Sequence, residues 1–111
     1  MFKYLSIIAL ISLLSLEALA IDQIQAKVTK AGIRGDGSLF VEFDKTINEP
    51  GCAAPKFEAA KDHPQIDRLL SIALSAAASG VLVNVRTNGC VRNAPGFDNS
   101  QASFFYFGER N

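Results

Sequence analysis

A chain of 111 residues has room for one domain. Its 11 Lys and Arg residues balance 11 Asp and Glu residues, so it lacks the basic excess that nucleic-acid binders normally show. A single histidine and two cysteines leave little material for a metal site. The sequence therefore predicts no cofactor, no metal and no nucleic-acid partner.

Residues 1–20 have the features of a signal peptide. Lys3 supplies a positive charge, residues 5–16 are an apolar run broken only by serines, and Ala18-Leu19-Ala20 resembles a cleavage site. The alternative is a transmembrane anchor, but such a run spans only about 18 Å as a helix, against a hydrocarbon core of about 30 Å. We expect a mature domain of residues 21–111 that is exported, either periplasmic or secreted, and has no membrane span.

Alternating apolar residues predict two strands joined by a tight turn. Within residues 24–28 the apolar residues have even numbers, whereas within residues 31–33 they have odd numbers. Because a slip of one residue turns side chains to the opposite face, we expect a bulge or sharp bend within residues 29–32. Gly35-Asp36-Gly37 then predicts a hairpin turn, and residues 39–43 predict the returning strand.

The stretch 63–90 predicts one helix, a glycine stop and one strand. Pro64 suits the first helical turn, and Gly80 suits a left-handed stop. Asp62 or His63 is expected to cap the helix. After Gly80, alternating valines predict a half-buried strand. The helical face expected to seal the core consists of Ile66, Leu69, Leu70, Ala73, Leu74 and Ala77.

The remaining segments complete an order of three strands, one helix and two strands. Residues 56–60 are a weak candidate for the third strand, and residues 101–108 are a strong aromatic candidate for the last. This order predicts a mainly β domain with one helix, arranged as a small five-stranded OB-like barrel. The alternative is an open antiparallel sheet packed by one helix.

Two cysteines in an exported chain most simply form one disulfide. A bridge between Cys52 and Cys90 would close a large loop and stabilise the fold. The alternative is two free thiols with redox or metal chemistry, but the sequence has no C-x-x-C spacing that would support it.

The pattern A-L-x-A-x-x-S-G-x-x-V-x-V, which begins at Ala73 and is followed by Cys90, resembles a group of small exported bacterial proteins. The same helix-glycine-strand unit is similar to part of the B subunits of subtilase cytotoxin and pertussis-type toxins. The resemblance covers mainly residues 63–90. It implies an OB-fold, assembly into pentamers and binding of cell-surface glycans, but it assigns no sugar-contacting residue in this chain.

The sequence contains no constellation of catalytic residues. His63 would need a nucleophile and an orienting acid to act as a base, and no motif supplies them, so we expect a surface or capping role for it and no enzymatic activity. Arg34-Gly35-Asp36 spells the integrin-recognition tripeptide, although the hairpin turn alone explains its glycine and aspartate.

Two surfaces are candidates for binding. Ser71, Ser75 and Ser79, with Ile72, form a narrow helical stripe that is either a solvated face or a homo-oligomer interface. Phe104 with Tyr106, or Phe105 with Phe107, could form an aromatic platform for a ligand, and core packing is expected for at least one pair. The sequence thus predicts a non-enzymatic binding protein for a glycan or a protein. The alternative is a structural or accessory periplasmic protein that acts only by assembling with itself or a partner.

Overall fold

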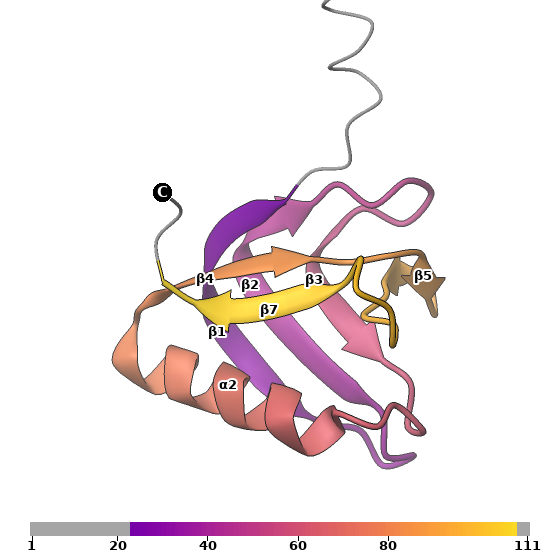
Figure 1. Cartoon of the computed structure of the whole chain (residues 1–111), viewed down its shortest axis with the longest axis horizontal. Helices are drawn as coiled ribbons and strands as arrows, with labels where there is room; N and C mark the ends of the chain where they lie inside the picture. The colour runs from indigo at the N-terminus through magenta and orange to yellow at the C-terminus, as the bar shows by residue number, and fades with distance from the viewer. Residues whose placement is uncertain (1–22, 109–111) are drawn as a thin grey trace, which may run out of the picture.

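The computed structural model describes residues 23–108, in which one helix packs on a five-stranded antiparallel sheet (Figure 1). The strand order in the sheet is β3-β2-β1-β4-β7. The predicted signal peptide, residues 1–20, lies outside the described residues. The elements of the domain are β1 (Ile24–Ile33), β2 (Leu39–Ile47), β3 (Ala54–Ala59), α2 (Ile66–Ser79), β4 (Leu82–Arg86) and β7 (Phe104–Phe107), with a separate ribbon of β5 (Cys90–Val91) and β6 (Ala94–Pro95).

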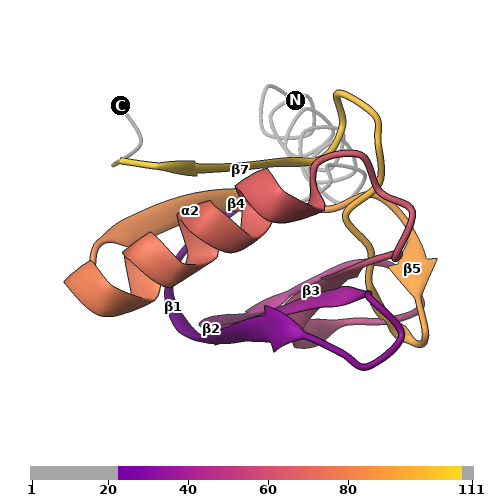
Figure 2. The same cartoon turned by 90° about the horizontal axis from the view of Figure 1, so that it is seen from below.

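Strand β1 is long and bent, and it joins the two halves of the sheet. Its first part pairs with β4 and its second part pairs with β2. The register shifts between Val28 and Lys30, which places a bulge at Thr29. The predicted slip in residues 29–32 is therefore confirmed. The bulge lets one strand serve both halves of a strongly curved sheet, as Figure 2 shows.

The hairpin between β1 and β2 forms at the predicted turn. Gly37 has a φ of 94°, a conformation that favours glycine, and its N–H donates to the carbonyl of Arg34 at 2.9 Å. Asp36 Oδ1 accepts hydrogen bonds from both the N–H and the hydroxyl of Ser38. The returning strand forms as predicted, and its residues at alternate positions, Leu39, Val41 and Phe43, are all buried.

The five-stranded sheet is not closed into a barrel, so the open antiparallel sheet packed by one helix describes this domain better than the barrel expectation. Closure would require backbone pairing between the two edge strands, β3 and β7. In the described residues β3 instead meets the loop before β7, through an isolated bridge between Glu58 and Gly96 and a hydrogen bond from Phe97 N–H to the Glu58 carbonyl. Aromatic side chains then span the remaining gap.

Phe57 is the centre of this aromatic packing. Its ring lies 5.1 Å from that of Phe97 and 5.3 Å from that of Phe105, measured between centroids. Phe43 adds further ring contacts to both Phe57 and Phe105. The edge-to-face geometry of the Phe57–Phe105 pair is the arrangement that aromatic quadrupoles favour. Strand β7 is therefore attached to β3 through side chains rather than through backbone hydrogen bonds.

Helix α2 ends where predicted and begins slightly later than predicted. Gly80 has a φ of 71° and donates its N–H to the carbonyl of Ala76, a left-handed C-terminal cap. At the other end Pro64 lies before the helix, and the N-cap position is Gln65, which makes no side-chain capping bond. His63 lies two residues before this N-cap, and its Nδ1 accepts a hydrogen bond from the Gln65 N–H at 3.0 Å.

The face of α2 that seals the core differs from the prediction. Leu69, Ala73 and Ala76 are buried, whereas Leu74 is 51% exposed. Ala77 is also exposed, so the predicted face was wrong at these two positions. The alanine-rich sequence offers two overlapping apolar stripes, and the helix packs through the one with the smaller side chains, which lets it approach the sheet closely.

This assignment predicts different costs for two Leu→Ala substitutions in the same helix. Leu69→Ala should lower the free energy of unfolding by about 2–5 kcal/mol, because it leaves a cavity in the core. Leu74→Ala should change it by less than about 0.5 kcal/mol, because the side chain is exposed. Urea denaturation of both variants measures the difference, and equal costs would show that the helix packs through the originally expected face.

Cys52 and Cys90 form the predicted disulfide, with an S–S distance of 2.09 Å. The bridge joins the loop between β2 and β3 to the β5–β6 ribbon across a sequence separation of 38 residues. It thereby fixes the ribbon beside the open side of the sheet.

We predict that Cys52→Ser and Cys90→Ser each lower the free energy of unfolding by about 4 kcal/mol, since either change releases the same large loop in the unfolded chain. The double variant should cost about as much as either single variant. Denaturation curves of the three variants check this, and additive costs would contradict a shared bridge.

The loop that leads into β7 is organised around Asp98. Its carboxylate accepts hydrogen bonds from the Ser100 N–H and from the side chains of Ser100, Ser103 and Asn88. Burial by itself would raise the pKa of Asp98, but these hydrogen bonds outweigh burial and lower its pKa from 3.8 to about 2. The ionised carboxylate therefore stabilises the entry into the last strand.

Asp98→Asn should lower the free energy of unfolding by about 1 kcal/mol at neutral pH. Because the pKa of Asp98 is lower in the folded chain, its contribution is present above pH 4 and is lost as the pH falls toward about 2. Denaturation curves of wild type and variant should therefore converge in acid. A stability difference that stays constant from neutral pH to about pH 2 would contradict this role.

Candidate functional site

Strands β4 and β7 present one set of side chains to the core and another to the opposite, outer face. Val83, Val85 and Phe105 are buried in the core. The strand alternation places Asn84 and Arg86 on the outer face of β4, where they pair in register with Tyr106 and Phe104 of β7. We call these four residues, Asn84, Arg86, Phe104 and Tyr106, the outer platform.

The aromatic half of the outer platform is one of the two ring pairs that the sequence offered. The centroids of Phe104 and Tyr106 lie 5.7 Å apart, with their planes tilted by 45°. Tyr106 is 47% exposed and Phe104 is half-buried. Of the other predicted pair, Phe105 belongs to the core and Phe107 is exposed. Phe104 and Tyr106 thus form the aromatic pair that is available to a ligand on the surface.

The polar half of the outer platform is Asn84, which sequence reasoning missed. Its side chain is fully buried, and its Nδ2 donates to the carbonyl of Gly108 at 2.5 Å. Since that carbonyl requires a donor, the amide orientation is fixed and Oδ1 points elsewhere. Oδ1 has no hydrogen-bond partner among the described residues. A buried acceptor without a partner is costly, and natural proteins keep few of them.

Arg86 carries a second unpartnered polar atom on the same face. Its Nε is buried and makes no hydrogen bond within the described part of the chain. In residues 23–108 no carboxylate lies within ion-pair distance of its guanidinium. The outer platform therefore combines two aromatic rings with one free acceptor and one free donor. The sequence signal for this site was an asparagine between two valines in a strand, where its propensity is poor.

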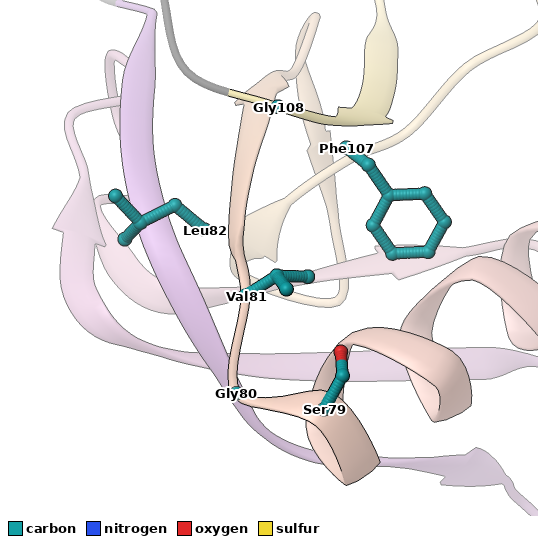
Figure 3. Close-up of a pocket in the computed structure, with 6 residues that line it drawn as sticks. All are labelled: Ser79, Gly80, Val81, Leu82, Phe107 and Gly108. Carbon is teal, nitrogen blue, oxygen red and sulfur yellow. The ribbon is translucent and has the colours of Figure 1, made fainter.

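A groove of about 660 Å³ opens on the other side of β7, between the end of α2 and the end of that strand (Figure 3). The ring of Phe107, the side chain of Val81 and the hydroxyl of Ser79 point toward it, while Leu82 points away. Phe107 is 46% exposed and Val81 is 42% exposed. The flank of β7 opposite the outer platform is therefore also apolar and accessible.

The candidate oligomer stripe on α2 is only partly at the surface. Ser71, Ser75 and Ser79 are exposed, and the Ser79 hydroxyl donates to the Ser75 carbonyl at 2.8 Å. Ile72 is half-buried and packs against the core instead. The large apolar residue that α2 leaves exposed is Leu74. The three serines remain a candidate interface, and Ile72 adds little to it.

His63 has a structural role that uses both ring nitrogens. Nδ1 accepts from the Gln65 N–H, so Nε2 carries the proton and donates to the Asp98 carbonyl at 2.9 Å. The ring joins the start of α2 to the loop before β7. In residues 23–108 no group of three or more His, Cys, Asp or Glu side chains is placed to hold a metal ion.

The charged residues of the hairpin tripeptide are engaged within the chain. Arg34 donates to buried Glu58 at 3.1 Å and lies over the ring of Phe40. Asp36 forms an ion pair with Arg92 and accepts hydrogen bonds from Ser38. Lys56 also pairs with Glu58, at 3.3 Å. These contacts favour a structural interpretation of the tripeptide over an adhesive one.

Searches against family models, curated proteins and solved structures found no match to this chain. None of the helices in the described part is long and apolar enough to cross a membrane.

Proposed function

We propose that this chain is an exported, non-enzymatic binding protein whose outer platform holds a glycan. The observation that carries the proposal is the position of Tyr106 and Phe104 beside a buried amide oxygen, Asn84 Oδ1, that lacks a hydrogen-bond partner. Sites for small ligands typically combine apolar and aromatic lining with a few placed polar groups. The outer platform has that composition.

A sugar ring matches these groups chemically. Its C–H faces pack on aromatic rings, and its hydroxyls both donate and accept hydrogen bonds. Both Asn84 Oδ1 and Arg86 Nε are buried, so sugar hydroxyls would pair with them, one as donor and one as acceptor, only once the side chains that cover the two atoms move aside. Neutral apolar ligands would satisfy the rings but leave both polar atoms unpaired, which costs binding energy. The chemistry of the outer platform thus favours a carbohydrate.

Three further features support export and a binding role. The first 20 residues have the pattern of a signal peptide, and the Cys52–Cys90 bridge suits an oxidising compartment. The curved sheet, with its helix between β3 and β4, has the element order of an OB-like fold. The resemblance of residues 63–90 to toxin B subunits adds a precedent for glycan binding by such a domain.

The test is a glycan-array screen of the exported protein with one variant on the site and one control. Tyr106→Ala should weaken binding of any retained glycan by about two- to tenfold, a loss of the size expected for one stacked aromatic ring. Ile33→Ala removes a side chain of comparable exposure, 44%, from β1 and should bind as wild type does.

Two results would contradict the proposal. One is a folded protein that retains no glycan on the array. The other is glycan binding that Tyr106→Ala leaves unchanged, since that would place the ligand elsewhere on the molecule.

A second candidate function is assembly alone, as a structural or accessory periplasmic protein. The observation that favours it is the uncharged edge of β7 with exposed Phe107 beside it. This function predicts stable association in the absence of any glycan binding, so the array screen and a measurement of molecular mass separate the two candidates.

A further inference from the structure

The sequence contains a single Asn-Gly pair, Asn88-Gly89, and it lies between β4 and the β5–β6 ribbon. Both residues are exposed. Because glycine has no Cβ, it leaves the backbone nitrogen after an asparagine less hindered than any other residue does. At Gly89 the surroundings add no obstacle, since nothing lies within 4 Å of the place where a Cβ would stand. The Gly89 nitrogen is therefore open on the side where a side chain would otherwise shield it.

The backbone N–H of Gly89 is also unengaged, because in the described part of the chain no group accepts a hydrogen bond from it. Asn99 provides a contrast within the same protein. It is exposed as well, but the N–H that follows it belongs to Ser100 and donates to Asp98 Oδ1 at 3.1 Å. Asn88 thus combines an exposed side-chain amide with a free, unhindered nitrogen next to it in the chain.

We propose that Asn88 is a site of spontaneous deamidation in the folded protein. The Gly89 nitrogen attacks the Cγ of Asn88, an intramolecular step between adjacent groups. Its proton passes through solvent to the departing nitrogen, and ammonia leaves as the bond from Cγ to Nδ2 breaks. The resulting succinimide ring takes up one water molecule at either of its carbonyls, which yields aspartate or isoaspartate. The net reaction consumes water, releases ammonia and needs no enzyme. This modification goes beyond the proposed function and does not depend on it.

The position of Asn88 gives the product a structural consequence. Asn88 Nδ2 donates to Asp98 Oδ2 at 2.6 Å. The Asp98 carboxylate is ionised at neutral pH, since its hydrogen bonds lower its pKa to about 2. Deamidation replaces the amide donor with a second carboxylate, so a hydrogen bond becomes a repulsion between like charges. The loop that leads into β7 then loses one of the contacts that organise it.

Isoaspartate would also lengthen the backbone inside a hydrogen-bonded pair. The Asn88 N–H donates to the Gly96 carbonyl at 2.9 Å, and the Gly96 N–H donates to the Gly89 carbonyl at 2.8 Å. Cys90 follows directly, so the change lies beside the bridge that fixes the β5–β6 ribbon. We expect the aged protein to hold both the ribbon and the loop before β7 less firmly.

Ageing of the folded, exported protein at mildly alkaline pH measures the reaction, with peptide mapping by mass spectrometry and an isoaspartate assay. Asn88 should convert to aspartate and isoaspartate while Asn99 stays unmodified. Asn88→Gln is the matched control, because it keeps a side-chain amide but could cyclise only through a larger ring, and it should form no isoaspartate at this position. A parallel sample in urea reports the reaction of the unfolded chain.

The Asn88→Asp variant tests the structural consequence. At neutral pH its thermal midpoint should lie about 4–8 °C below that of fresh wild type, the shift expected for loss of one hydrogen bond in a domain of this size. The midpoint of aged wild type should move toward that of the variant. The difference should shrink below about pH 4, where the introduced carboxylate becomes protonated.

The inference is supported if folded wild type converts at Asn88 and loses stability in step with the conversion. It is overturned if Asn88 reacts only in urea, if Asn99 reacts as fast as Asn88, or if Asn88→Asp is as stable as wild type. A protein that binds no glycan would refute the proposed function and leave these three comparisons unaffected.

Discussion

The packing of Phe105 against Phe57 is the interaction on which the rest of the structure depends. The two rings come from the two edge strands of an open sheet and meet edge to face, with 5.3 Å between their centroids. No backbone ladder joins these strands in the described residues. Side-chain packing therefore holds β7 in place on one flank and β4 holds it on the other, and within residues 23–108 no strand pairs with the outward backbone groups of β7.

This arrangement gives β7 three distinct surfaces. Phe105 is committed to the core, so the alternation of the strand turns Phe104 and Tyr106 outward beside Asn84. The neighbouring residue Phe107 lies past the end of the core and stays exposed near α2. One short strand thus supplies both a core side chain and the aromatic half of the outer platform that we propose as the ligand site.

Sequence patterns predicted the features that depend on local chemistry. The glycine stop at Gly80, the bulge near Thr29 and the Cys52–Cys90 bridge each follow from residue type, parity or compartment. The features that depend on tertiary packing were missed. Alanine at many helical positions left the buried face of α2 undetermined, so Leu74 was expected inside. The gap between β3 and β7, and the burial of Asn84 and Glu58, depend on neighbours distant in sequence, which periodicity does not report.

The most direct test of this account is residue-resolved amide hydrogen exchange of β7 in the exported protein. At low concentration the amide of Tyr106, which bonds to β4, should exchange more slowly than the amide of Phe107, which faces away from β4. Equal protection of both amides in dilute solution would show that the edge is already covered within one chain, and would contradict the account.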